Sequence, residues 1–256
     1  MQPPNGNIIT CQALMKKKDD LKAMNRDNVQ VFLVKFQNEI SFHEIPLFRG
    51  AVLSALGNDA ELLYHNHTGD STFRYSYPLI QYKRIQKKAA IFCIGEGVDA
   101  IGQFLSAQKF DIHLGERPIQ LAIETVYPKR NLVQTWDSTF RYHLRNWLAL
   151  NSENYQKYKE LDEITARISF LENILIGNLL SFAKGMKIEI KNQIVCKLLS
   201  MDEPRLTTVK GVRMMTFDVE FKSNLSLPDY MGLGKHVSIG YGTVVRAYNT
   251  ENNHKE

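Results

Sequence analysis

The hydrophobic pattern of the first half of the chain alternates between strand-like and helix-like segments. Residues 29–36 (VQVFLVKF) form a β-branched and aromatic run that predicts a strand. Residues 44–56 carry apolar side chains at helical spacing and stop before Gly57, so they predict a helix. The next elements expected are strands at 79–85 and 89–94, a helix at 98–107 and a strand at 110–114. This order is that of the ferredoxin-like split βαβ unit, an antiparallel sheet with two helices on one face.

The second half of the chain repeats this alternation with different lengths. Asn151 is placed to cap one long helix, whose apolar stripe runs from Leu161 to Phe182 and which ends at Gly185. The polar segment 128–137 is expected to separate two strands. Four strands are expected in all, at residues 119–126, 141–150, 188–199 and 214–221.

The pattern is interrupted at residues 115–118 (GERP), which predicts a domain boundary there. The 256 residues are enough for two hydrophobic cores, one in each half of the chain. We therefore expect an α+β protein with two tandem ferredoxin-like (RRM-like) domains, at residues 1–116 and 117–256.

The composition of the chain mainly excludes classes of protein and of site. With 32 Lys+Arg against 27 Asp+Glu, the net charge of +5 permits an anionic partner such as RNA but does not require one. No apolar run approaches the ~20 residues that span a bilayer, and residues 1–20 lack the apolar block of a signal peptide, so a cytoplasmic protein without membrane contact is expected. A CxxC zinc site and a disulfide framework are excluded by the wide spacing of Cys11, Cys93 and Cys196, of which the last two are expected in the core.

The most informative stretch is residues 232–242 (GLGKHVSIGYG), near the C-terminus. Its glycines allow close approach of the backbone to another chain, and such a loop can hold phosphates through its N–H groups. It is neither a dinucleotide fingerprint nor a P-loop, because it lacks the helix-opening G-x-G-x-x-G and a Gly-Lys-Ser/Thr. A tight hairpin that needs glycine turns is the alternative interpretation.

A second polar cluster carries two histidines one residue apart and several cations and tyrosines: His65, His67, Arg74, Tyr75, Tyr77, Lys83 and Arg84. Two imidazoles beside a cation suit metal-free RNA cleavage. One removes the proton of the ribose 2′-OH, the other protonates the leaving 5′ oxygen, and the cation balances the charge on the phosphate. Two other interpretations stay open: a His-x-His pair that binds zinc, and polar loop surface.

Taken together, these pieces resemble a known family. Residues 232–242 resemble the glycine-rich loop of the RAMP superfamily, and the whole chain is similar to the CRISPR-associated Cas-six endoribonucleases of subtype b. Three further segments fit that subtype: 46–50 (PLFRG), 148–155 (LALNSENY) and 177–185 (GNLLSFAKG).

The resemblance implies two ferredoxin-like domains side by side and recognition of the repeat in a precursor CRISPR RNA. It implies one cut per repeat by metal-independent transesterification, which leaves a 2′,3′-cyclic phosphate and a 5′-hydroxyl. Neither a cofactor nor a metal is implied. A homodimer and a CRISPR effector complex are assemblies that the resemblance leaves open.

The resemblance also implies roles for single residues. His67 is implied as the principal acid–base residue and His65 as its partner, because the family's catalytic histidine follows the first helix. Tyr75 is implied as a supporting tyrosine, with Tyr77 as its substitute, and Arg74 is a candidate for the cation that a lysine supplies elsewhere in the family. Contacts with the RNA backbone are implied for Gly232, Gly234, Lys235, His236, Ser238, Gly240 and Gly242.

A non-catalytic RAMP-fold subunit that only binds guide RNA within an effector complex is the main alternative. Histidines at the family position favour the enzyme over this binder. A zinc hydrolase built on His65 and His67 would need a third ligand, and the sequence does not point to one.

Overall fold

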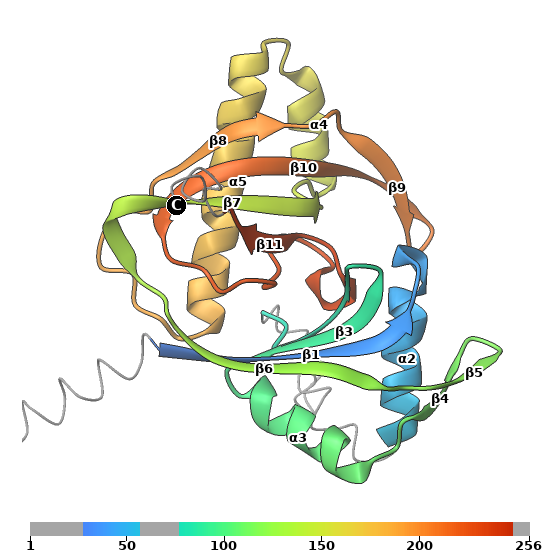
Figure 1. Cartoon of the computed structure of the whole chain (residues 1–256). Coiled ribbons are helices and arrows are strands. Elements are labelled where there is room, and N and C mark those ends of the chain that lie inside the picture. The colour runs from blue at the N-terminus through green and yellow to red at the C-terminus, as the bar shows by residue number, and fades with distance from the viewer. Residues whose placement is uncertain (1–27, 57–76, 248–256) are drawn as a thin grey trace, which may run out of the picture.

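The computed structural model describes residues 28–56 and 77–247, which form two α+β units packed against each other (Figure 1). The first unit contains, in chain order, β1 (Asn28–Glu39), the 3-10 turn η1 (Phe42–Glu44), α2 (Ile45–Leu56), β2 (Ile80–Ile85), β3 (Lys88–Ile94), α3 (Gly97–Ala107), β4 (Asp111–Leu114), β5 (Arg117–Gln120) and β6 (Ile123–Leu132). Its antiparallel sheet has the strand order β2-β3-β1-β6. The strands and helices predicted between residues 29 and 107 are confirmed.

Local sequence explains how α2 begins and what it buries. The backbone N–H of Ser41 donates to the Glu44 carboxylate at 2.7 Å, and the two residues form a capping box ahead of the helix. Phe48 and Val52 are fully buried on the face that meets the first sheet. Phe104 of α3 is buried in the same cluster, so both helices cover one face of this sheet, as predicted.

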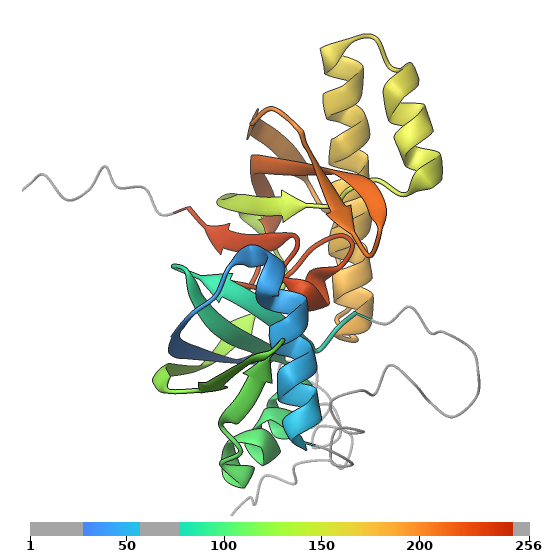
Figure 2. The same ribbon diagram turned by 90° about the vertical axis from the view of Figure 1, so that its right-hand side faces the viewer.

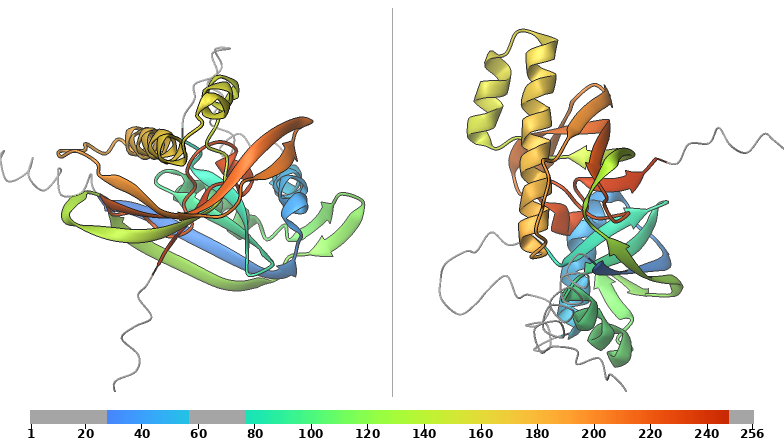
Figure 3. Two further views of the ribbon diagram at one scale, coloured as in Figure 1. Left: turned by 90° about the horizontal axis from the view of Figure 1, so that it is seen from above. Right: turned by 90° about the vertical axis from the view of Figure 1, so that its left-hand side faces the viewer.

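The fourth strand of the first sheet is β6, and the prediction that residues 110–114 fill this place is wrong. β6 pairs with β1 from Asn28 opposite Leu132 onward. The chain instead turns back at Gly115, where φ is +65°, and β4 pairs with β5 as a separate hairpin at the periphery (Figure 3). The break at residues 115–118 is therefore a hairpin turn, and the first sheet extends past the predicted boundary at 116/117.

The second unit has the same strand arrangement. It contains β7 (Thr135–Trp147), α4 (Ser152–Glu160), α5 (Ile164–Gly185), β8 (Cys196–Met201), β9 (Arg205–Val209), β10 (Val212–Leu225), the 3-10 turn η3 (Val237–Ile239) and β11 (Thr243–Arg246). The antiparallel order is β11-β7-β10-β8, and β9 pairs with the first part of β10. In both sheets the last strand lies beside the first, then the third, then the second. Two ferredoxin-like units in an α+β fold are thus confirmed.

The predicted long helix is two helices, α4 and α5, separated where Leu161 adopts an extended backbone. The Asn151 side chain accepts from the Asn154 N–H at 2.6 Å, so the predicted cap is confirmed, but it caps α4. Of α4 only Tyr158 is buried, whereas α5 carries the apolar stripe and ends at Gly185 as predicted. The α4–α5 pair projects beyond the second sheet (Figure 2). None of the helices in the described ranges is both long and apolar enough to cross a membrane.

Two strand predictions in the second half also need correction. Most of the polar segment 128–137 is strand, because β6 and β7 run almost to their connection. β6 is the edge strand of its sheet and most of its side chains are exposed, so its polar residues need no burial. The strand expected at 188–199 is confined to Cys196–Met201.

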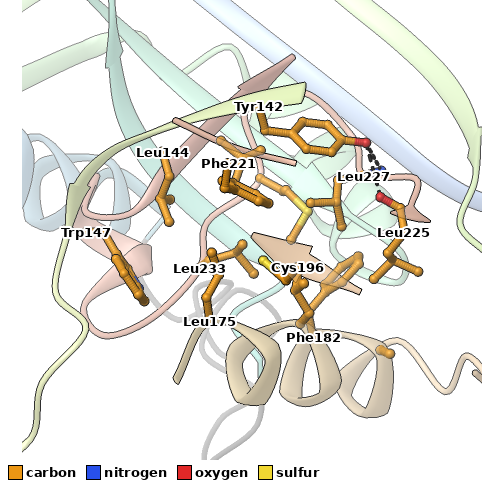
Figure 4. Packing of buried hydrophobic residues seen from close by; sticks show 14 of the residues in the cluster. Tyr142, Leu144, Trp147, Leu175, Phe182, Cys196, Phe221, Leu225, Leu227 and Leu233 are labelled. Atoms are coloured by element: carbon orange, nitrogen blue, oxygen red, sulfur yellow. Dashed lines mark hydrogen bonds between the residues drawn. The ribbon is translucent and has the colours of Figure 1, made fainter. Parts of the chain in front are cut away.

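The two units share a hydrophobic core. One cluster joins Leu33 and Phe92 of the first sheet to Tyr142 and Phe221 of the second and to the stripe of α5. Figure 4 shows α5 packing its side chains against this sheet, and the Tyr142 hydroxyl donating to the Leu225 carbonyl at 3.2 Å. The core position predicted for two cysteines is confirmed, since Cys93 and Cys196 are buried, free thiols, while Cys11 lies outside the described residues.

Candidate nucleic-acid interface

The glycine-rich stretch 232–242 is part of the connection from β10 to β11, residues 226–242, which is termed the glycine-rich loop. This loop takes the place of the second helix in its unit. Its only regular element is η3, a single 3-10 turn. Met231, Leu233 and Val237 of the loop are buried, so the loop is part of the core. It also closes on the first unit, because a Cβ on Gly240 would lie 2.6 Å from the Ile45 side chain of α2.

Glycine is required in this loop by backbone conformation and by space. Gly242 has φ +62°, and a Cβ there would overlap the Leu233 carbonyl group. Gly234 has φ +91°, and a Cβ there would lie 2.7 Å from the Trp147 ring. Trp147 is fully buried, so its ring packs in the core.

The loop residues predicted to contact RNA fall into two groups. Gly232, Gly240 and Gly242 are enclosed by protein. The remaining four border a pocket: Gly234, Lys235, His236 and Ser238. The first group therefore shapes the loop, and the second is placed to meet a ligand.

This pocket has a volume of about 390 Å³ and lies between the loop, α5 and the start of the first unit's hairpin. It is lined by Tyr77, Pro78, Asn178, Ser181 and residues 233–238. None of these lining residues is acidic. Burial lowers the pKa of His236, and the nearby charges of Lys210 and Lys235 lower it further. The pocket is suited to an anionic ligand.

Tyr77 joins the glycine-rich loop to both units through its hydroxyl and its ring. Its hydroxyl donates to the Gly232 carbonyl at 2.9 Å and accepts from the Gly232 N–H and from the Gln81 amide. Its ring packs edge-on against Phe182, and a Cβ on Gly185 would overlap the Cβ of Tyr77. Enclosure of the hydroxyl raises the pKa of Tyr77. Tyr77 therefore holds the loop and α5 together, and its role as a substitute for Tyr75 stays a prediction.

Lys83 and Arg84, the last members of the polar cluster, do not line the pocket. Lys83 is buried between the units, with its Nζ 3.1 Å from the Thr243 hydroxyl, and burial lowers its pKa to about 7. Arg84 donates from its Nε to the Ile40 carbonyl at 2.7 Å.

His65, His67, Arg74 and Tyr75 lie outside the described residues, so their predicted roles stay predictions. The segment that carries them follows α2 and joins the described chain at Tyr77, which lines the pocket.

Sequence reasoning missed two pocket residues, Asn178 and Ser181 of α5. Both lie in the segment 177–185 that fits the family resemblance, but no role was assigned to them. Their spacing of three residues in an otherwise apolar segment is the available signal, since it puts two polar side chains on one face of the helix.

Comparison with known families agrees with this architecture. The family model of the Cas6b N-terminal domain matches residues 27–131, and that of the Cas6b C-terminal domain matches residues 134–247. The chain belongs to the Cas6b family. The two Cas6b models meet where β6 gives way to β7, which places the boundary after residue 131 rather than at 116/117.

Solved structures of the family have the same fold. A crystal structure described as Cas6b matches with a TM-score of 0.76 and 28% identity, over 86% of this chain and 100% of that one. Another, described as the CRISPR RNA processing endoribonuclease Cas6b, matches with a TM-score of 0.66 and 27% identity over the same shares. A protein of Methanocaldococcus jannaschii, named only as uncharacterized, is 39% identical over 100 residues, which are 39% of this chain and 67% of that protein.

Proposed function

We propose that this Cas6b family member is an endoribonuclease that cuts precursor CRISPR RNA within the repeat. The observation that carries the proposal is the match, along 86% of the chain, to a solved structure described as a CRISPR RNA processing endoribonuclease. The pocket supports it, because the described residues that line it include a lysine and hydroxyl groups but no carboxylate that would repel a phosphodiester.

The proposed reaction is a transesterification that needs no metal. The ribose 2′ oxygen attacks the adjacent phosphorus as the bond from phosphorus to the 5′ oxygen breaks. One histidine of the pair His65 and His67 takes the 2′-OH proton, and the other gives a proton to the leaving 5′ oxygen. The products are a 2′,3′-cyclic phosphate and a 5′-hydroxyl. An unperturbed imidazole pKa of ~6.5 lets one residue type do both tasks near neutral pH.

In this proposal one cation acts on the reacting phosphate and others bind the rest of the RNA backbone. Arg74 stabilises the charge that builds on the phosphate, with Tyr75 beside it in sequence. Lys235 and His236, on the exposed side of the glycine-rich loop, hold the RNA backbone outside the reacting group. A homodimer and a CRISPR effector complex stay predictions from the family resemblance.

The test is cleavage of a labelled repeat RNA, taken from the CRISPR array nearest the gene, in excess EDTA. A matched RNA carries a 2′-deoxy nucleotide at the scissile position. We expect cleavage of the first RNA and none of the second, because the attacking hydroxyl is missing. Binding without cleavage, even after divalent metals are restored, would replace this proposal with the non-catalytic RNA-binding subunit.

A further inference from the structure

Asn178 and Ser181 face the pocket from α5, opposite the glycine-rich loop. They lie one helical turn apart and come from a different element than the loop residues. Ser181 is exposed, and Asn178 is half-buried. The pocket therefore presents polar side chains from two walls, although the family resemblance pointed only to the loop.

The Asn178 amide is held in one orientation by Trp147. The Trp147 indole N–H donates to Asn178 Oδ1 at 2.9 Å. An indole nitrogen is only a donor, so the oxygen of the amide must face it and the NH₂ group must point away. Within the described residues this is the one hydrogen bond that the Asn178 side chain makes. Its two N–H donors thus have no partner among the described residues and lie beside the pocket.

Trp147 also fixes the opposite wall. Its ring leaves no space for a Cβ on Gly234. Leu148, which follows Trp147 in the chain, accepts a hydrogen bond at its carbonyl from the backbone N–H of Lys235 at 3.2 Å. One buried side chain thereby sets the distance between the Asn178 amide and the base of Lys235. Such rigid support is what a precise binding site requires.

The lining favours a phosphate over a base. Both aromatic rings of the pocket are engaged by other rings: Tyr77 packs on Phe182, and His236 packs on Tyr241 with centroids 6.3 Å apart. Among the described residues that line the pocket none carries a negative charge, and Lys235 adds a cation. Amide N–H, hydroxyl and ammonium donors together match the oxygens of a phosphodiester.

We propose that Asn178 is an RNA-positioning residue whose side-chain amide, oriented by Trp147, donates to a phosphodiester oxygen of the bound repeat, with Ser181 and Lys235 as further donors. This inference rests on the proposed function and adds a contact from α5 to it. The volume of about 390 Å³ has room for one nucleotide together with its phosphate.

The test compares Asn178→Asp with Asn173→Asp, a control that makes the same charge change on the exposed face of α5. In Asn178→Asp the new carboxylate can still accept from the Trp147 indole, so the support of the helix is kept, but its second oxygen repels a phosphate. Binding is measured with the repeat RNA that carries the 2′-deoxy scissile nucleotide. We expect Asn178→Asp to weaken binding by about tenfold or more, and Asn173→Asp by less than about threefold.

A second set of RNAs identifies the contacted group. Each phosphate of the repeat is replaced in turn by a neutral methylphosphonate. At one linkage we expect the penalty of Asn178→Asp to fall to that of the control. Ser181→Asp, at an exposed position whose substitution leaves the core intact, should show its loss at the same or the adjacent linkage.

Two results would overturn this inference while leaving the proposed function intact. In the first, the wild-type protein binds the repeat and Asn178→Asp weakens binding no more than Asn173→Asp does. In the second, the loss of affinity in Asn178→Asp persists with every methylphosphonate RNA and disappears only when one base is removed. The second would make Asn178 a base contact. Failure of the wild-type protein to bind the repeat would overturn the proposed function and this inference with it.

Discussion

The two units have the same strand order but differ in the connection that precedes their last strand. In the first unit this connection contains α3, which packs Phe104 onto its own sheet. In the second unit it is the glycine-rich loop, which satisfies its backbone by contacts with other elements. The Leu233 N–H donates to the Gly242 carbonyl at 2.8 Å, and the Gly242 N–H to the Asn146 carbonyl at 3.0 Å.

A helix closes its own hydrogen bonds, whereas a loop that replaces one depends on its neighbours. The glycine-rich loop takes these neighbours from both units, since it is bonded to Tyr77 as well as to β7. The loop places Lys235 and His236 at the pocket. Tyr77, where the segment with His65 and His67 joins the described chain, lines the same pocket. The glycine-rich loop, which stands in the place of the second helix, thus both lines the pocket and connects the two units.

The largest expected effect is that of Gly242→Ala. The new Cβ would overlap the Leu233 carbonyl, and φ of +62° is itself unfavourable for alanine. We expect a loss of about 3 kcal/mol or more in the free energy of unfolding, measured in urea. Gly211→Ala is the matched control, because Gly211 has φ +80° but open space, so it should lose only about 1 kcal/mol. Equal losses would mean that packing around Gly242 is not the constraint.

His67→Ala tests whether RNA cleavage depends on the first unit and RNA binding on the loop of the second. Because the proposed role is proton transfer, single-turnover cleavage should fall by roughly 10²-fold or more while the affinity for the 2′-deoxy repeat is unchanged. Lys235→Ala should instead weaken the affinity for RNA and leave single-turnover cleavage of bound RNA unchanged. It should also lower the slope of log affinity against log salt concentration by about one. His113→Ala, exposed on β4, is the control. Parallel loss of binding and cleavage in His67→Ala would make that segment a binding element.

Local patterns predicted the first unit well because its elements are decided locally. The capping box at Ser41, the periodic apolar face of α2 and the hairpin of β2 and β3 all follow from residues close in sequence. The helix and strands of the second unit were located less well, since the strand expected at 119–126 as part of that unit contributes to β6 of the first sheet.

Features set by distant partners were missed. β6 is a polar edge strand, so only its pairing with β1 places it in the first sheet. Asn178 acquires a defined orientation only because Trp147, far from it in sequence, donates to it. The sequence likewise singled out all four glycines of residues 232–242, but not which of them would be enclosed. Long-range contacts decide these points, and one sequence does not display them.

Lys83→Met examines the contact that joins the units. Burial lowers the pKa of Lys83 from 10.5 to about 7, so the unfolded chain binds more protons than the folded one between these values. The lysine therefore costs stability in full below pH 7, and this cost fades as the pH rises toward 10.5. We expect Lys83→Met to stabilise the protein by about 2 kcal/mol at pH 6, with a smaller gain at pH 9.

Urea unfolding at pH 6, 7.5 and 9 measures this difference. Thr243 keeps a partner in the variant, since its hydroxyl also donates to the Gly240 carbonyl at 3.2 Å. Lys129→Met, on the exposed face of β6, serves as the control and should show no such dependence on pH. A pH-independent effect of Lys83→Met would show that the lysine is not buried as a neutral group.

The smallest expected effect is that of Gly102→Ala, the counterpart of Gly242→Ala in the first unit. Gly102 lies within α3, and a Cβ there would meet no described atom within 4 Å. Alanine favours the helix by about 0.5–1 kcal/mol, so the urea midpoint should rise and cleavage should be unchanged. A fall in the midpoint would mean that α3 also needs a glycine for a contact. A rise would show that the same substitution has opposite signs in the two connections, because one supports its own backbone and the other does not.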